Sequence, residues 1–160
     1  MMYSDASLGN IDDKIKSCKA YIVFLADDEN CSALSWNCKK IDRVCTSTLE
    51  AETRAMKFGV NHALAIRTML NEIFDFDIPI HCYIDSKQLE KACFSTKNVS
   101  CPVLRRDVAL LQQWMQKGDI TKVLHVRSAE QLADVMTKKG VNPLKLSRVL
   151  ETGKLPSDLP

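Results

Sequence analysis

The stretch that decides the fold is residues 46–74, which read TSTLEAETRAMKFGVNHALAIRTMLNEIF. Its apolar residues recur at steps of three and four, the period of one helix face; they are Met56, Gly59, Val60, Ala63, Ile66, Leu70 and Ile73. Ser47 and Glu50 have the spacing of a capping box, so we expect the helix to begin there. The sequence therefore predicts one long amphipathic helix that packs its apolar face on a core.

Glu52 has no such structural role. It precedes Met56 by four residues and so lies on the apolar face itself. A carboxylate that faces a core is costly unless a cation or hydrogen bonds compensate for it. The alternative is that Glu52 stays solvated in the first turn, where the helix dipole favours a negative charge. The helix alone leaves both interpretations open.

The composition is that of one ordinary globular domain. The chain has 160 residues, of which 46% are apolar and 26% charged, and its net charge is +2. There is no basic tail or arm to indicate nucleic acid, although a weakly basic domain can still carry a basic face. Because no apolar run reaches membrane-spanning length and no signal peptide precedes the first element, we expect no membrane partner.

The cysteines indicate a reducing compartment. There are seven of them, an odd number, and no C-x-x-C pair occurs among Cys18, Cys31, Cys38, Cys45, Cys82, Cys93 and Cys101. This pattern argues against a disulfide framework and against a structural zinc site. We therefore expect reduced cysteines that fill the core of an intracellular protein.

The hydrophobic periodicity predicts an α/β protein. Strands are expected around 2–3 and over 19–25, 32–38, 78–84 and 122–126, and helices over 47–74, 87–93, 103–117, 128–136 and 144–150. The candidate inner residues of the helix over 103–117 are Val103, Val108, Leu111, Trp114 and Met115. Ser128 and Gln131 have the spacing of a second capping box, and the charged residues 11–17 are expected to form a loop or a fraying strand end. This order of elements fits a layered α/β sandwich with a mixed sheet.

Four acidic residues lie where these elements begin or end. We expect Asp5 to end the first strand, Asp85 to end the strand after the long helix, and Asp134 to lie on the helix after the last strand, with Glu52 as the fourth acid. Carboxylates that gather in one place need a positive charge between them, and oxygen-only clusters suit Mg²⁺ or Mn²⁺. Each acid alone is more simply a solvated side chain, and spacing by itself does not select these four.

Six segments, taken in order, resemble the ribonuclease H domain of copia-type retrotransposon polyproteins. They are 3–10 (YSDASLGN), 20–25 (AYIVFL), 33–44 (ALSWNCKKIDRV), 47–52 (STLEAE), 83–86 (YIDS) and 130–140 (EQLADVMTKKG). The similarity extends almost from end to end, through RVLETGKL at 148–155. Any one motif is weak, but all of them in register make the resemblance specific.

The resemblance implies a ribonuclease H-like α/β fold, with a five-stranded mixed sheet flanked by helices. It implies a single domain over 1–155 and a loose tail over 156–160. The implied activity is endonucleolytic hydrolysis of the RNA strand of RNA–DNA hybrids by two-metal-ion catalysis, with Mg²⁺ or Mn²⁺, during reverse transcription. The implied catalytic and metal-binding residues are Asp5, Glu52, Asp85 and Asp134.

The resemblance also suggests how substrate is held. Thr48 and Ser86 are candidate minor-groove contacts, although each could merely cap a helix. Candidate phosphate contacts are Lys39, Lys40, Arg43, Lys87 and Arg127. The implied partners are the hybrid and an adjacent reverse transcriptase domain, and the implied location is the cytoplasm, in a virus-like particle, if the chain is transposon-borne.

Two departures from cellular ribonucleases H affect the expected activity. The loop at 127–129 has no histidine, so we expect product release to differ. Residues 94–102 are too short and too weakly charged for a basic handle helix, so we expect weak hybrid affinity for the isolated domain. Two alternatives remain open. One is a catalytically weak or domesticated module that binds hybrid without cutting it, and the other is an integrase-like polynucleotidyl transferase on the same fold.

Overall fold

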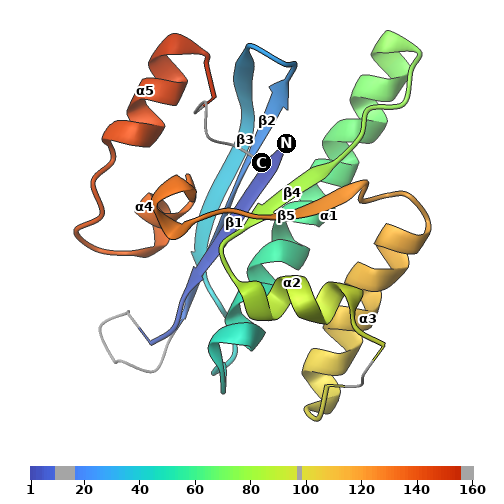
Figure 1. The fold of residues 1–160 in the computed structure, drawn as a ribbon, viewed down its shortest axis with the longest axis vertical. Coiled ribbons are helices and arrows are strands. Elements are labelled where there is room, and N and C mark those ends of the chain that lie inside the picture. Colours follow the sequence, from blue (N-terminus) through green and yellow to red (C-terminus); the bar gives the residue numbers. More distant parts are fainter. Residues whose placement is uncertain (10–16, 97–98, 156–160) are drawn as a thin grey trace.

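The structure is a computed structural model that describes residues 1–9, 17–96 and 99–155. In this part of the chain five strands form one sheet with the order β3-β2-β1-β4-β5 (Figure 1). They are β1 (Met2–Ser7), β2 (Cys18–Ala26), β3 (Cys31–Lys40), β4 (His81–Ile84) and β5 (Lys122–His125). Because β1 is antiparallel to β2 and parallel to β4, the sheet is mixed and β1 lies at its centre. The predicted fold class is confirmed.

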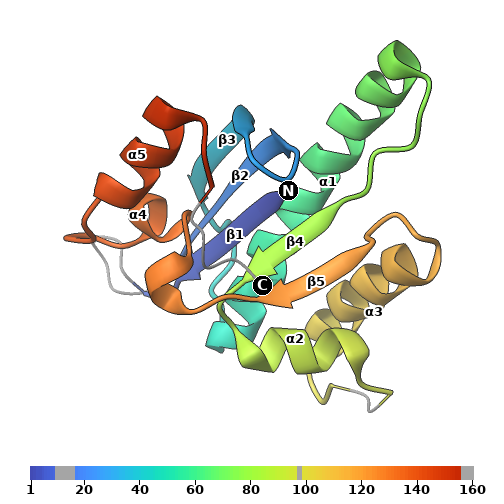
Figure 2. The same cartoon turned by 45° about the horizontal axis from the view of Figure 1, so that its top comes forward.

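Helices cover both faces of the sheet (Figures 1 and 2). α1 (Thr48–Phe74), α2 (Lys87–Phe94) and α3 (Pro102–Gln116) pack on one face, and a 3₁₀ turn (Ser128–Glu130), α4 (Asp134–Thr137) and α5 (Leu144–Thr152) lie on the other. Side chains of β1 alternate between these two layers. Met2 joins the core beneath α1 with Met56, and Tyr3 joins the opposite core with Leu132 and Val149.

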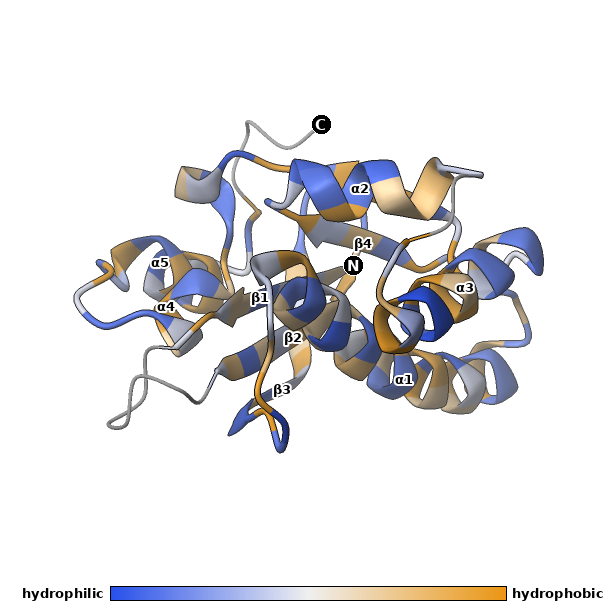
Figure 3. Cartoon of the chain, turned by 90° about the horizontal axis from the view of Figure 1, so that it is seen from below, coloured by the Kyte–Doolittle hydropathy of each residue, from blue (hydrophilic) through white to orange (hydrophobic). Residues whose placement is uncertain are grey.

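The long helix begins where the sequence predicts. The Ser47 hydroxyl accepts a hydrogen bond from the Glu50 amide at 3.2 Å and so caps α1. The Glu50 carboxylate accepts from the Thr46 amide and hydroxyl, both at 3.0 Å, one residue before the cap. The apolar stripe is less uniform than predicted, because the last turns of α1 project away from the sheet (Figure 2) and leave Ile73 exposed. Figure 3 shows the mixed hydropathy of α1 and α3, as expected for helices with one buried side.

Three local predictions are wrong. Asp5 lies inside β1 and does not end it. β4 begins at His81 because Pro79 has no amide hydrogen to donate to a neighbouring strand. The inner residue near the start of α3 is Leu104, while Val103 is only half-buried.

Other expectations concern segments that the structure describes only in part. Most of the predicted charged loop falls on 10–16, and the predicted tail is 156–160; both lie outside the described residues. All seven cysteines are free, which agrees with the absence of a disulfide framework. Within the described ranges, every helix is too short or too polar to cross a bilayer.

Gly59 allows α1 to approach the sheet closely. A Cβ at this position would lie 2.6 Å from Met2 Sδ and 2.9 Å from Tyr21 Cβ. We expect Gly59→Ala to lower the free energy of unfolding by about 1–3 kcal/mol, the usual cost of overpacking, although alanine ordinarily stabilises a helix. Asn61→Ala, at an exposed site on the same helix, should be neutral or stabilising. Urea denaturation would measure both, and equal effects would contradict the close approach.

Candidate active site

The fold brings three of the predicted acids together. Asp5 lies in the central strand with no exposed surface, and Asp85 directly follows β4. Tyr3 pairs with Tyr83 in parallel register, so Asp5 and Asp85, each two residues further on, point the same way. Asp134 begins α4, which packs on β1. One carboxylate oxygen from each of the three lies within 4.8 Å of the others.

Glu52 borders the same group of carboxylates. It is buried at the second turn of α1, and the backbone of Ala6 donates a hydrogen bond to it. Burial, followed by the negative charges of Asp5 and Asp85, raises its pKa to about 9. Its Oε2 atom is buried and has no hydrogen-bond partner among the residues that the structure describes. The interpretation that Glu52 stays solvated in the first turn is therefore wrong.

Asp5 is a second buried carboxylate whose charged form is disfavoured. Burial raises its pKa to about 7, and the nearby charges of Asp134 and Asp85 act in the same direction. The Thr137 hydroxyl opposes this shift by donating a hydrogen bond to Asp5 Oδ2, as does the positive charge of Lys138. Thr137 also fixes the orientation of the carboxylate, because the other Asp5 oxygen is left to face the cluster.

Lys138 supplies the positive charge that the carboxylates require. Its Nζ lies 2.6 Å from Asp134 Oδ1, 3.4 Å from Asp5 Oδ1 and 4.0 Å from Asp85 Oδ2. Partial burial lowers the pKa of Lys138, but the hydrogen bond to Asp134 and the three negative charges outweigh it and raise the pKa. Sequence reasoning assigned no role to Thr137 or Lys138. The available signal was their spacing, three and four residues after Asp134, which places them on the same side of a helix.

The segment before α4 is organised by the site, and the second predicted capping box is wrong. Ser128 Oγ donates to Asp85 Oδ2 at 3.1 Å and caps no helix. The side-chain Nε2 of Gln131 donates to the carbonyl oxygens of Ser4 at 3.1 Å and Tyr83 at 3.4 Å, on β1 and β4. These bonds tie the segment to the sheet, so the predicted helix over 128–136 becomes a 3₁₀ turn followed by the short α4.

The two predicted substrate contacts lie at the starts of helices beside the cluster. Ser86 Oγ accepts from the Leu89 amide at 3.2 Å and caps α2, immediately after Asp85. Thr48 is the exposed first residue of α1, one turn before Glu52. The capping role proposed as an alternative is thus present for Ser86, while the cap of α1 is Ser47.

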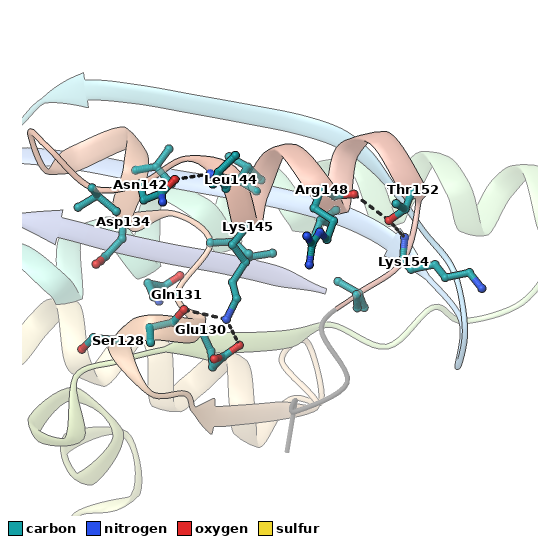
Figure 4. A pocket seen from close by; sticks show the side chains of 17 residues that line it. Ser128, Glu130, Gln131, Asp134, Asn142, Leu144, Lys145, Arg148, Thr152 and Lys154 are labelled. Carbon is teal, nitrogen blue, oxygen red and sulfur yellow. Dashed lines mark hydrogen bonds and ion pairs between the residues drawn. The ribbon is translucent and has the colours of Figure 1, made fainter.

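A cavity of about 890 Å³ lies beside the cluster, between the 128–135 segment and α5. Figure 4 shows Arg148 and Lys145 pointing into it from α5, and Lys145 is paired with Glu130. Asp134 lines one end of the cavity. The remaining lining is largely aliphatic and includes no other acid of the cluster. The cavity therefore adjoins the carboxylates through Asp134 and does not contain them.

Cations gather on a neighbouring surface, which we call the basic surface. It consists of Lys19, Lys39, Arg43, Arg54, Lys57 and Arg106. The ammonium groups of Lys19 and Lys39 both lie over the Phe58 ring, at 4.7 and 4.6 Å from its centre. The other four residues line a hollow of about 370 Å³ between α1 and α3, together with Asp107, whose carboxylate pairs with Lys57 at 2.5 Å. Burial and then the charge of Lys39 lower the pKa of Lys19, against the opposing charge of Asp42.

The donor set of the carboxylate cluster fits a hard divalent cation. The ligand atoms are all carboxylate oxygens, the group preferred by Mg²⁺ and Mn²⁺. The like charges lie so close that they need a cation, and Glu52 contributes a buried oxygen with no other partner. Zinc is a poor fit, because no histidine or cysteine belongs to the group found among the described residues.

Comparisons with known proteins concern the fold and the sequence as a whole. No protein-family model matches the sequence. The chain is 29% identical over 138 residues to the Retrovirus-related Pol polyprotein from transposon RE2 of Arabidopsis thaliana. The matched segment covers 85% of this chain but only 9% of that polyprotein.

Two solved structures show the same fold at low sequence identity. RNase H1 from the archaeon Halobacterium salinarum superposes with a TM-score of 0.58 at 20% identity, covering 85% of this chain and 92% of that one. LC11-RNase H1 in complex with an RNA/DNA hybrid gives a TM-score of 0.60 at 14% identity, covering 85% and 91%. The expected resemblance is thereby confirmed: the chain has the ribonuclease H fold and is similar to a short part of a retrotransposon Pol polyprotein.

Proposed function

We propose that this chain is an endonuclease that hydrolyses the RNA strand of RNA–DNA hybrids. The observation that carries the proposal is the convergence of Asp5, Glu52, Asp85 and Asp134 at the centre of a ribonuclease H fold. The likeness to a structure solved with an RNA/DNA hybrid supports the substrate class. The similarity to a Pol polyprotein supports a role in retrotransposon reverse transcription, beside an adjacent reverse transcriptase domain.

The four acids would hold two Mg²⁺ or Mn²⁺ ions through their carboxylate oxygens. When bound, such ions lower the pKa of an attacking water and stabilise the charge on the leaving 3′-oxygen. Asp5 and Glu52 must be ionised to act as ligands, although their burial favours the protonated forms. Thr137 and Ser128 keep the Asp5 and Asp85 carboxylates oriented by donating hydrogen bonds to them.

The surface around the cluster would hold the duplex. Thr48 and Ser86, at the starts of α1 and α2 beside the acids, would contact the minor groove. Arg54 and Lys57 belong to the same turns of α1 as Glu52, so a duplex bound at the cluster also passes near the basic surface. Among the described residues neither Arg43 nor Arg106 has an ion-pair partner, which leaves both free for phosphates.

Replacing one acid tests the activity. We expect Asp85→Asn to reduce the cleavage rate by at least about 100-fold, the scale on which one electrostatic element of a hydrolytic site contributes. The assay uses labelled RNA–DNA hybrid, RNA duplex and DNA duplex, with Mg²⁺ or Mn²⁺ and with EDTA. Asp28→Asn, at an exposed turn of the β2–β3 hairpin, removes the same charge and should leave the rate unchanged.

The same assay separates the alternatives. Cleavage of RNA only in the hybrid, and only with metal, supports the proposal. Binding without cleavage by the unaltered chain would favour a hybrid-binding module, and nicking or joining of DNA would favour an integrase-like enzyme.

The raised pKa values of Asp5 and Glu52 predict a pH dependence of stability in EDTA. A raised pKa means that the folded state binds the proton more tightly, so stability is fully present below the unfolded pKa and is lost as pH rises through the folded pKa. For Asp5 this loss ends near pH 7, and for Glu52 near pH 9. Urea denaturation should therefore show that the unfolding free energy of Glu52→Gln falls less steeply between pH 7 and 9 than that of the unaltered chain. Parallel curves for the two proteins would contradict the burial of an ionisable Glu52.

The basic surface predicts salt-dependent binding. In the Asp85→Asn background, Arg106→Glu should weaken hybrid binding and reduce the slope of log K against log salt by about 1 for each lost phosphate contact. Lys117→Glu, an equal charge change at the exposed far end of α3, is the matched control. Fluorescence anisotropy at several salt concentrations would measure both slopes, and identical slopes would show that the hybrid does not pass over this surface.

A further inference from the structure

The ammonium group of Lys138 lies where the proposed function would place a divalent metal ion. Its ammonium contacts one oxygen of Asp134 and one of Asp5 and lies at the edge of ion-pair distance from Asp85. These are the same acids whose oxygens converge within 4.8 Å of one another. A single ammonium therefore faces all three members of the cluster that would hold a divalent ion.

Two cations cannot share this group of oxygens without strong repulsion. The repulsion between like charges grows as their distance shrinks, and a divalent ion at contact distance doubles the repulsion that a univalent one would exert on the ammonium. The Lys138–Asp134 distance of 2.6 Å also means that an oxygen is engaged by the ammonium before any ion arrives. The ammonium and a divalent ion are thus alternatives at these oxygens.

We propose that Lys138 is a resident counter-ion of the carboxylate cluster, which a divalent cation must displace in order to bind. The inference rests on the proposed function, because it concerns the same metal site. Lys138 would hold the acids together when no metal is bound, and it would set a threshold for metal binding. It is a positioning residue, since it acts on the ligands and not on the substrate.

The local structure allows this exchange. The Lys138 side chain is 34% exposed and reaches the cluster on a flexible stem from the position directly after α4. It can move toward solvent without disturbing the sheet. Asp5 keeps its hydrogen bond from Thr137, and Asp85 keeps its hydrogen bond from Ser128, so the ligands remain oriented after the ammonium has left.

The test compares Lys138→Met with Lys139→Met. Methionine preserves much of the length of the stem and removes the charge, and Lys139 is exposed, so its variant controls for the loss of one charge nearby. Titration with MgCl₂ by isothermal calorimetry, without substrate, should give a dissociation constant at least about tenfold lower for Lys138→Met, because a competing charge at contact distance is removed. Lys139→Met should bind Mg²⁺ as the unaltered chain does.

Thermal unfolding supplies a second readout. In EDTA, Lys138→Met should have a lower Tm than the unaltered chain. Saturating Mg²⁺ should raise the Tm of Lys138→Met by more than it raises the Tm of the unaltered chain. Equal Mg²⁺ affinities for the three proteins, or weaker binding by Lys138→Met, would overturn the inference and leave the proposed function intact. If none of the three binds Mg²⁺ or Mn²⁺, the metal site fails and the proposed function with it.

Discussion

The structure depends on the burial of a carboxylate in its central strand. Asp5 has neighbours on both sides of β1 and no exposed surface, so its charge must be compensated within the protein. Thr137 and Lys138 supply that compensation from α4, a helix of only four residues that would have little stability alone. α4 is therefore held in place by the negative charge of Asp5, which Thr137 and Lys138 compensate. This connects the first strand of the chain with a segment more than 120 residues later.

Close packing of α1 completes the arrangement from the other layer. Ala51, Ala55 and Gly59 present small surfaces to the sheet, and Ala51 and Ala55 form a compact core with Ala6. This close approach brings Glu52 within hydrogen-bonding reach of the Ala6 backbone, beside Asp5. The burial that stabilises the helix also removes Glu52 from water. Burial favours the protonated form of Glu52, whereas a metal ligand must be ionised. Such a conflict between stability and function is common at functional sites.

Local rules predicted elements well where neighbours in sequence supply the hydrogen bonds. Ser47 caps α1 as its spacing indicates, because its acceptor and the Glu50 amide are three residues apart. The same rule failed at Ser128, whose hydroxyl instead bonds Asp85, 43 residues away. A partly buried charge is a stronger acceptor than an ordinary cap site, so the tertiary hydrogen bond prevails over the local one. Ile73 was misjudged for a related reason: periodicity reports which side of a helix is apolar and does not report how far the sheet extends beneath it.

The sequence by itself determined the positions of most strands and helices and, through its resemblance to a known family, the four acids of the candidate site. Those features follow from periods, caps and motifs that are written within a few consecutive residues. Only the tertiary structure decided that Lys138 lies among the acids, that Glu52 is buried and that six cations share one surface. The physical reason is that the energy of a charge depends on which other charges and how much water surround it. That environment is assembled from strands and helices that meet only when the sheet has formed.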